Sequence, residues 1–322
     1  MPSVSNAAVI ENCHRILSRH ARSFSWAARL LPKKMYDEAA ILYAFCRVVD
    51  DAVDTADNQE DARQSIRYLT AELLSDTPEQ PIIRAFKEIN HTYPLSILAA
   101  QHLIDGVSQD IAAVKIQNDP ELLRYCYKVA GTPGLMMCPI IGVKNIKALP
   151  FAIDLGIAMQ LTNICRDIAE DAQQNRVYIP NARLQKVDIK QNNVLTGEFD
   201  PHQLMPVVED LLTMAERYYQ SGNHGMRYIP FLPRCAIIVA SRLYRAIGRK
   251  VKRKGIVALK TRTAVTPVEK MILLINAVAL SMLSPIMPIF RKQPHDQSLH
   301  TGLEELVARD YYQKIFTGDH HD

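Results

Sequence analysis

Two groups of acidic residues in the sequence have the spacing of metal ligands on helices. The first lies in the segment YAFCRVVDDAVD, where Asp50 and Asp54 are four residues apart. They therefore share one helical face, with Asp51 about 100° round the helix. Acids this close repel one another, and a cation over them would relieve the repulsion. Because the flanking residues are apolar, a merely solvated acidic face is the weaker interpretation, and the group predicts a cation site.

The second group lies in the segment QLTNICRDIAEDAQQNRVYIP. Asn163, Asp167 and Asp171 follow at four-residue steps, which gives one stripe of oxygen ligands along a predicted helix. Gln160 extends this stripe upstream. Glu170 is offset by one position, where it can turn inward or pair with Arg166 one turn away. Apolar residues surround the stripe, so a core helix of this kind needs a cation.

Together the two groups indicate a diphosphate that is bridged by magnesium ions. Mg²⁺ prefers a few carboxylates, water and substrate phosphates to a complete protein cage. Ions held between two carboxylate walls would neutralise the charge that develops on a leaving diphosphate. Acid pairs without a metal could instead act as general acid and base, as in glycoside hydrolysis. Six acids and an asparagine exceed what that chemistry needs.

Composition and charge limit the function classes. The chain has 322 residues, of which 48% are hydrophobic and only 7% aromatic, a composition that suits packed helices. Its net charge of +4 does not indicate a nucleic-acid partner.

The six cysteines form no CxxC pair, which is typical of reduced core residues in a cytosolic protein. The N-terminus lacks the order of a signal peptide. The histidines show no metal-ligand spacing, and no glycine-rich nucleotide motif occurs.

Helical periodicity runs through nearly the whole chain, and no convincing strand pattern occurs. Breakers such as Asp119-Pro120 separate the segments, and several place proline in a first helical turn. We expect helices over residues 6–21, 34–55, 61–75, 81–90, 95–114, 120–129, 134–141, 148–173, 201–221, 232–254 and 267–283. The sequence thus predicts one all-α domain over residues 1–290 and a polar, mobile tail over residues 291–322.

One uncharged stretch, residues 271–290, is long enough to span a membrane. Pro285, Pro288 and the internal Asn276 and Ser281 argue against a clean span. We expect a buried core helix with a proline-rich exit. Peripheral membrane contact is the alternative.

The quoted motifs resemble those of the squalene/phytoene synthase family. The matching segments are HARSFSWAARLLP, YAFCRVVDDAVD, YCYKVAGTPG, QLTNICRDIAEDAQQNRVYIP and SRLYRAIG, in the family's order over roughly residues 13–262. The resemblance implies an isoprenoid-synthase helical bundle around a central cavity. It also implies a prenyltransferase that depends on Mg²⁺, with Mn²⁺ as the alternative ion, and acts on a prenyl diphosphate substrate without NADPH.

The resemblance also assigns roles to individual residues. It implies metal binding by Asp50, Asp51, Asp54, Asn163, Asp167, Glu170 and Asp171. It implies catalytic roles for Tyr43, Arg47, Asp50, Asp54, Tyr125, Gln160, Asp167 and Asp171. It implies substrate contact by Ser23, Phe24, Arg47, Val129, Gly134, Asn163, Arg176, Tyr178, Tyr244 and Arg262.

The implied reaction is the head-to-head (1′-1) condensation of two geranylgeranyl diphosphates through prephytoene diphosphate to phytoene, in carotenoid biosynthesis. The stretch LPRCAIIVASRLYRAIGRKVKRKG is similar to bacterial phytoene synthases. The alternatives are presqualene diphosphate, dehydrosqualene and squalene synthases acting on two farnesyl diphosphates. A non-catalytic assembly factor of the same fold is a further alternative, disfavoured because both acid groups are intact. We expect a cytoplasmic enzyme with peripheral contact to the inner membrane, and no oligomeric state is predicted.

Overall fold

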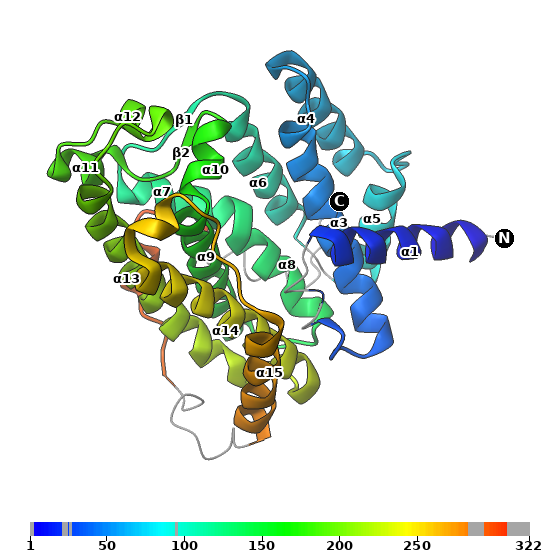
Figure 1. Ribbon diagram of the computed structural model, residues 1–322. Helices are drawn as coiled ribbons and strands as arrows, with labels where there is room; N and C mark the ends of the chain where they lie inside the picture. Colours follow the sequence, from blue (N-terminus) through cyan, green and yellow to red (C-terminus); the bar gives the residue numbers. More distant parts are fainter. Residues whose placement is uncertain (1–2, 21–24, 26–27, 94–95, 283–292, 308–322) are drawn as a thin grey trace.

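A computed structural model of the chain describes residues 3–20, 25, 28–93, 96–282 and 293–307 (Figure 1). The predicted all-α fold is confirmed. The longer helices are α1 (Ser3–His20), α3 (Lys33–Asp54), α4 (Gln59–Leu74), α5 (Pro81–Thr92), α6 (Ile97–Ser108), α7 (Asp119–Cys126), α8 (Thr132–Ile140), α9 (Leu149–Arg166), α13 (Pro201–Gly225), α14 (Phe231–Lys254) and α15 (Pro267–Met282). Three short helices lie between α9 and α13, namely α10 (Ile168–Gln173), α11 (Asn181–Leu184) and α12 (Gln191–Thr196).

Helix starts follow local signals in the sequence. The side chain of Asn58 caps α4 by accepting hydrogen bonds from the backbone N–H groups of Glu60 and Asp61, at 2.9 and 3.0 Å. Asn118 and Asp200 cap α7 and α13 in the same way. Proline stands in the first turn of α5, α7, α9 and α13, where its missing N–H costs nothing.

Helix α9 is the central element of the bundle, and α8, α13 and α14 pack around it. Its side chains Ile153, Ile157 and Leu161 are fully buried. A π-helical segment, η2 (Tyr127–Gly131), follows α7 and lies directly against α9. A Cβ atom at Gly156 would lie only 2.3 Å from the carbonyl oxygen of Ala130. The glycine therefore permits a close backbone contact between α9 and η2.

The single helix predicted over residues 148–173 is interrupted at Asp167. Helix α9 ends at Arg166 and α10 begins at Ile168, while Asp167 has φ −106° and ψ 15°. The Asp167 N–H donates to the Asn163 carbonyl at 2.9 Å, and the Asp171 N–H donates to the Asp167 carbonyl at 2.8 Å. Because the four-residue hydrogen bonding continues across the break, the three predicted ligands stay in helical register.

Two short strands, which the sequence does not predict, pair in parallel beside the acid groups. Strand β1 (Val114–Lys115) pairs with β2 (Arg176–Val177). The side chain of Gln191 donates to the Ile116 carbonyl at 2.7 Å and holds the chain after β1. The pairing places Arg176 within hydrogen-bonding distance of Asp54, although the two residues are 122 positions apart in the sequence.

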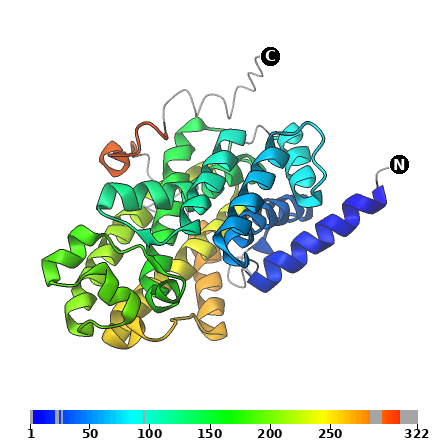
Figure 2. The ribbon, with the colours of Figure 1, turned by 90° about the horizontal axis from the view of Figure 1, so that it is seen from above.

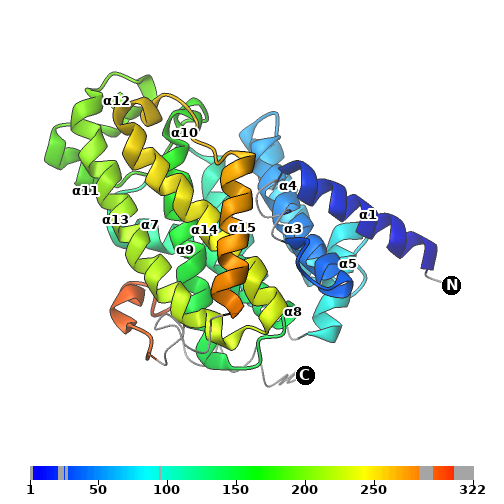
Figure 3. The ribbon, with the colours of Figure 1, turned by 60° about the horizontal axis from the view of Figure 1, so that its bottom comes forward.

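The uncharged stretch does not form a buried core helix. Helix α15 lies along the outside of α14 (Figure 3), and only one side of it, including Leu274, packs against the core. Four apolar side chains are exposed by about half or more, namely Val268, Met271, Ile272 and Ile275. The core-helix prediction is therefore wrong for residues 271–276, and the proline-rich exit lies among residues 283–292, outside the described residues.

Within the described part of the chain, one helical segment, Ile146–Arg166, is long and apolar enough to cross a membrane. It contains α9, and 67% of its apolar window is buried, because α9 is the core helix of the bundle.

Part of the C-terminal tail is ordered. Residues 293–307 lie against the bundle at the end away from α1 (Figure 2), and Leu299, His300 and Leu303 are buried. The Tyr218 hydroxyl of α13 donates to the Leu299 carbonyl at 2.6 Å. The mobility expected for the whole tail is therefore wrong for this segment.

Candidate active site

Two chambers adjoin each other in the middle of the bundle. The first, the acid chamber, has a volume of about 400 Å³ and is lined mainly by polar and charged side chains of α3, α9, α10 and the β2 region. The second, the apolar chamber, has a volume of about 340 Å³ and is lined mainly by apolar side chains of α8, α9, α13 and α14. Asp50, Val129, Gln160 and Asn163 line both chambers, so these residues mark the place where the chambers meet.

Most of the predicted site residues line one of the two chambers. Those in the acid chamber are Arg47, Asp50, Asp54, Tyr125, Val129, Gln160, Asn163, Asp167, Glu170, Asp171, Arg176, Tyr178 and Arg262. Those that line only the apolar chamber are Tyr43, Gly134 and Tyr244. Asp51 lines neither chamber, and its carboxylate accepts a hydrogen bond from Arg47. Ser23 and Phe24 lie outside the described residues. The individual roles remain predictions.

Asp50 on α3, which lines both chambers, has a raised pKa. Loss of hydration, followed by the negative charge of Asp54, raises the pKa of Asp50 to about 7. Arg47 opposes this shift, while Asp110 and Asp51 add to it. In the absence of a cation, the ionised form of this carboxyl group is therefore disfavoured.

An acid on α10 behaves in the same way. Burial, followed by the negative charge of Asp167, raises the pKa of Asp171 to about 8. Arg176 opposes the shift, whereas Asp110 and Glu170 reinforce it. On both sides of the acid chamber, the neighbouring arginines neutralise only part of the negative charge of the carboxylates. Such a site favours the binding of cations.

Arginines lie among these acids. The pairs are Arg176 with Asp54 (Nη1 to Oδ1, 2.9 Å), Arg166 with Asp167 (Nε to Oδ1, 2.7 Å), Arg262 with Glu170 (Nη1 to Oε2, 3.2 Å) and Arg47 with Asp51. Glu170 thus pairs with Arg262 rather than with Arg166. Three of these arginines, Arg47, Arg176 and Arg262, line the acid chamber, which can therefore bind an anion together with cations.

Unpartnered polar atoms show which ligands the acid chamber fits. Among the described residues, Asn163 Oδ1, Arg47 Nε and Arg176 Nε are buried and have no hydrogen-bond partner. Buried polar atoms normally have one. The amide oxygen of Asn163 suits a hard divalent cation, and the two guanidinium N–H groups suit phosphate oxygens. The donor set therefore fits a divalent metal and a diphosphate.

Asp110 is a site residue that sequence reasoning missed. It lies after α6, and its carboxylate accepts hydrogen bonds from the Tyr125 and Tyr178 hydroxyls, both at 2.9 Å. The two rings stack with centroids 4.7 Å apart. Burial raises the pKa of Asp110 to about 6, with Arg176 opposing the shift. An isolated acid, 15 and 68 residues from its partners, offers no spacing signal that could have identified it.

A comparison with protein families decides the identity of this fold. The squalene/phytoene synthase model matches residues 17–269. The chain belongs to the squalene/phytoene synthase family. The family prediction from the motifs is thereby confirmed. Members of this family are prenyltransferases that normally use a divalent metal, in agreement with the donor set of the acid chamber.

Several curated members of the family are similar to this chain over most of its length. A 15-cis-phytoene synthase of Enterobacter agglomerans is 34% identical over 277 residues, which cover 83% of this chain and 94% of the relative. A 15-cis-phytoene synthase of a Paracoccus species is 34% identical and covers 80% and 87%. A 4,4′-diapophytoene synthase of Staphylococcus haemolyticus is 31% identical and covers 80% and 92%.

Solved structures of the family share the fold. A dehydrosqualene synthase solved in complex with a ligand superposes with a TM-score of 0.77 at 27% identity, covering 87% of this chain and 98% of the other. A squalene synthase of Alicyclobacillus acidocaldarius gives a TM-score of 0.71 at 21% identity, covering 78% and 96%, a likeness of fold alone. The predicted isoprenoid-synthase bundle is therefore confirmed.

The raised pKa values predict how this squalene/phytoene synthase family member responds to pH. Protonation of Asp50 and Asp171 in the folded, metal-free chain contributes stability that is fully present below about pH 4. That contribution is lost as the pH rises through about 7 and about 8. A divalent cation needs ionised carboxylates, so we expect its affinity to be at least about tenfold weaker at about pH 6 than at about pH 8. Calorimetric titration with Mg²⁺ at the two pH values measures this difference.

The matched control is the double variant Asp50→Asn/Asp171→Asn, which lacks both titrating groups. Its residual Mg²⁺ affinity should change far less between the two pH values. Equal Mg²⁺ affinities of the unaltered chain at both pH values contradict the prediction.

Proposed function

We propose that this chain couples two molecules of geranylgeranyl diphosphate head to head, through prephytoene diphosphate, to phytoene in carotenoid biosynthesis. The observation that carries the proposal is the junction of the two chambers at Asp50, Val129, Gln160 and Asn163. A prenyl diphosphate has a highly charged head and an apolar tail, and its reactive C1 carbon joins them. The junction offers a place for that carbon between a site for the head and a site for the tail.

The acid chamber supplies the groups that release diphosphate. We propose that Asp50, Asp54, Asn163, Asp167 and Asp171 would hold Mg²⁺, which when bound would supply positive charge to the leaving diphosphate. The free Nε–H groups of Arg47 and Arg176 donate to diphosphate oxygens and orient the leaving group along the chamber. Arg262 lies at the open side, with 57% of its side chain exposed, and meets the head group as it enters.

The apolar chamber protects the cation that remains. Its walls exclude water, which would otherwise quench an allylic cation. The rings of Tyr43 and Tyr244 line this chamber and present π-electron density to a positive charge. Gly134 allows α8 to pack closely against α9 in the wall of this chamber, since a Cβ atom there would lie 2.7 Å from the Ala152 carbonyl oxygen.

The steps balance without a reductant. The C1–O bond of the first substrate breaks, and diphosphate takes the electron pair. The double bond of the second substrate attacks the cation, and loss of a proton closes a cyclopropane ring. The second C1–O bond then breaks, the ring opens with rearrangement to join the two C1 carbons, and loss of a second proton forms the central double bond. Two diphosphates and two protons leave, so NADPH is not required.

The same chambers would accept two farnesyl diphosphates, which is the alternative function. The similarity to a 4,4′-diapophytoene synthase and to a dehydrosqualene synthase structure favours it. Three of the phytoene synthases are 34% identical to this chain, against 31% for the 4,4′-diapophytoene synthase, and this difference favours geranylgeranyl diphosphate.

Incubation of the protein with Mg²⁺ and either the C15 or the C20 diphosphate, with and without NADPH, tests the function. We expect the C20 diphosphate to be consumed and phytoene to form at the same rate in both conditions, as measured by hydrocarbon chromatography with mass spectrometry. Preferential use of the C15 diphosphate would establish the alternative. If neither diphosphate is consumed, the enzyme proposal fails.

We also propose that the protein is cytoplasmic and contacts the inner membrane peripherally through the exposed apolar face of α15. The substrate tails and the product are lipids, and a surface helix with one apolar side can lie in the membrane interface. The exposed fractions of Met271 and Ile275 are 48% and 62%. Burial of such side chains in lipid is favourable by about 1.5–3 kcal/mol each.

The double variant Met271→Glu/Ile275→Glu should therefore lower the fraction of protein that co-sediments with lipid vesicles by about tenfold or more. Leu74→Glu on α4 is the matched control, because Leu74 is also about half exposed but lies on a different helix. Equal co-sedimentation of the α15 variant and the control would rule out this contact surface.

A further inference from the structure

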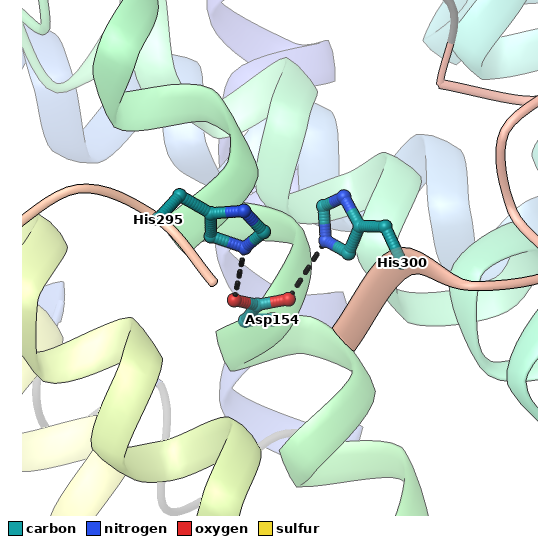
Figure 4. A group of neighbouring side chains, drawn as sticks. All are labelled: Asp154, His295 and His300. Atoms are coloured by element: carbon teal, nitrogen blue, oxygen red, sulfur yellow. Dashed lines mark hydrogen bonds and ion pairs between the residues drawn. The ribbon is translucent and has the colours of Figure 1, made fainter. Parts of the chain in front are cut away.

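A buried carboxylate and two histidines converge at the end of the bundle where residues 293–307 lie (Figure 4). His295 Nε2 lies 2.8 Å from Asp154 Oδ2, and His300 Nε2 lies 2.8 Å from Asp154 Oδ1. The side chain of Asp154 is fully buried, and those of the histidines are 12% and 11% exposed. The Ser221 hydroxyl donates to Asp154 Oδ2 at 2.5 Å. Three elements, α9, α13 and the C-terminal segment, thus meet at one carboxylate.

This cluster is separate from the acid chamber. Asp154 lies nine residues before Asn163 on α9, which is about 13 Å along the helix axis. None of the cluster residues lines either chamber. The proposed coupling reaction therefore does not use these side chains.

The charge of the cluster requires compensation. A fully buried carboxylate is costly unless it is paired or coordinates a metal. In the described part of the chain, the ion-pair partners of Asp154 are the two histidines, and no lysine or arginine pairs with it. A bound divalent cation is the other group that compensates such a carboxylate, and imidazole nitrogens are themselves metal ligands.

We propose that Asp154, His295 and His300 form a zinc site that fastens the C-terminal segment to α9. Two imidazole nitrogens and one carboxylate oxygen are a ligand set that proteins use for zinc. Such three-residue sites keep one coordination position for water, which the partial exposure of the histidines allows. Magnesium, in contrast, favours oxygen ligands, so this site and the acid chamber select different ions.

The positions of the ligand atoms suit a tetrahedral ion. One ligand atom from each residue lies within 4.8 Å of the others. With metal–ligand bonds of about 2.0–2.2 Å, tetrahedral ligands lie about 3.3–3.5 Å apart. Each histidine Nε2 now lies at a hydrogen-bond distance of 2.8 Å from the carboxylate, so it would have to give up any proton and move about 0.5–0.7 Å away to admit the ion. The hydroxyl of Ser221 orients the carboxylate from behind, as outer partners of metal ligands do.

The zinc site would stabilise one wall of the apolar chamber. The His295 ring packs edge-on against Phe151, with centroids 5.3 Å apart, and Phe151 lines that chamber. The C-terminal segment adds further contacts beside the cluster. The Tyr127 hydroxyl donates to the Leu306 carbonyl at 3.1 Å, and Leu303 is fully buried. Metal binding would therefore hold the segment and the chamber wall together.

Cobalt and zinc binding to the chelator-stripped, full-length protein tests the proposal. With excess Mg²⁺ present to occupy the acid chamber, we expect about one equivalent of Co²⁺ to bind and to show the visible absorption bands of tetrahedral cobalt. Zn²⁺ should displace it, and saturating Zn²⁺ should raise Tm by about 5 °C. A wild-type protein that binds no Co²⁺ or Zn²⁺ in the presence of Mg²⁺ overturns the proposal.

Conservative variants distinguish a zinc site from a cluster that is held by hydrogen bonds alone. In His295→Gln and His300→Gln the amide can still donate to Asp154 but is a poor metal ligand. We expect both variants to lose the cobalt bands and the Zn²⁺-dependent rise in Tm. His202→Ala, at an exposed histidine, and Asp167→Asn, in the acid chamber, should keep both signals. Unchanged metal signals in the glutamine variants overturn the proposal.

X-ray absorption at the zinc edge of the wild-type protein provides a test that depends on no variant. We expect two imidazole ligands per zinc. Fewer than two would contradict the site.

Discussion

Replacing Asp50 by asparagine is expected to lower kcat/KM for prenyl diphosphate coupling about a thousandfold. Asp50 is the carboxylate that lines both chambers, so it would hold a cation next to the carbon at which the diphosphate leaves. The asparagine side chain has nearly the same shape but no negative charge. Loss of one preorganised group that stabilises charge in a transition state costs about 10²–10³ in rate, and loss of a cation costs at least as much.

The adjacent acid provides the matched comparison. Asp51 has the same residue type and lies on the same helix, but it lines neither chamber and pairs with Arg47. We expect Asp51→Asn to lower kcat/KM by about tenfold at most, through the altered position of Arg47. A loss in Asp51→Asn as large as that in Asp50→Asn would contradict the assignment of the two acids.

A measurement of stability distinguishes lost chemistry from lost folding. Asp50 has a raised pKa because its ionised form is poorly compensated in the metal-free chain. Asp50→Asn should therefore leave Tm in chelator unchanged or higher at about pH 8. A lower Tm would show that the loss of activity arises from misfolding rather than from the missing charge.

Substituting Gly156 by alanine is expected to give the largest loss of stability among small substitutions on α9. The new Cβ atom would lie 2.3 Å from the Ala130 carbonyl oxygen and 2.6 Å from its carbon, so a backbone segment must move. Overpacking of this kind costs about 3 kcal/mol, which corresponds to a fall in Tm of roughly 5–10 °C. Activity should also fall, because Val129, in the displaced segment η2, lines both chambers.

Gly248→Ala on α14 is the matched control. The tightest contact of a Cβ atom there would be with a side-chain end, the Cδ2 atom of Leu212 at 3.1 Å, while Thr162 lies at an ordinary contact distance of 3.7 Å. The gain in helix propensity, about 1 kcal/mol, should offset this contact and leave Tm nearly unchanged. Thermal unfolding by circular dichroism compares the two variants. Similar Tm values for both would contradict the close contact between α9 and η2.

The positions of the two acid groups on helices were predictable because ligand spacing on a helix follows from its period. Asp50 and Asp54, like Asn163 and Asp167, are one turn apart wherever those helices lie. The all-α class was predictable for the same reason, since apolar periodicity depends on neighbours in sequence. The motifs also carried the family resemblance, which the comparison with known proteins confirmed.

Properties that depend on distant contacts were not predictable. Asp110 joins the site through Tyr125 and Tyr178, on two other elements. Apolar composition alone could not show that α15 would leave one side exposed, because a buried and a surface helix can have the same composition. The tail was expected to be mobile because its own residues are polar, yet Tyr218 on α13 holds its backbone.

The sequence by itself determined which side chains stand on one helical face, and thereby the acid walls and the family. Only the tertiary structure decided that these walls meet an apolar chamber at Asp50 and Asn163, and that Asp154 meets His295 and His300. The physical reason is the separation along the sequence over which each kind of interaction acts. Helical register is set by hydrogen bonds four residues apart, whereas the chambers and the cluster exist only where packed helices bring together residues that are up to 146 positions apart.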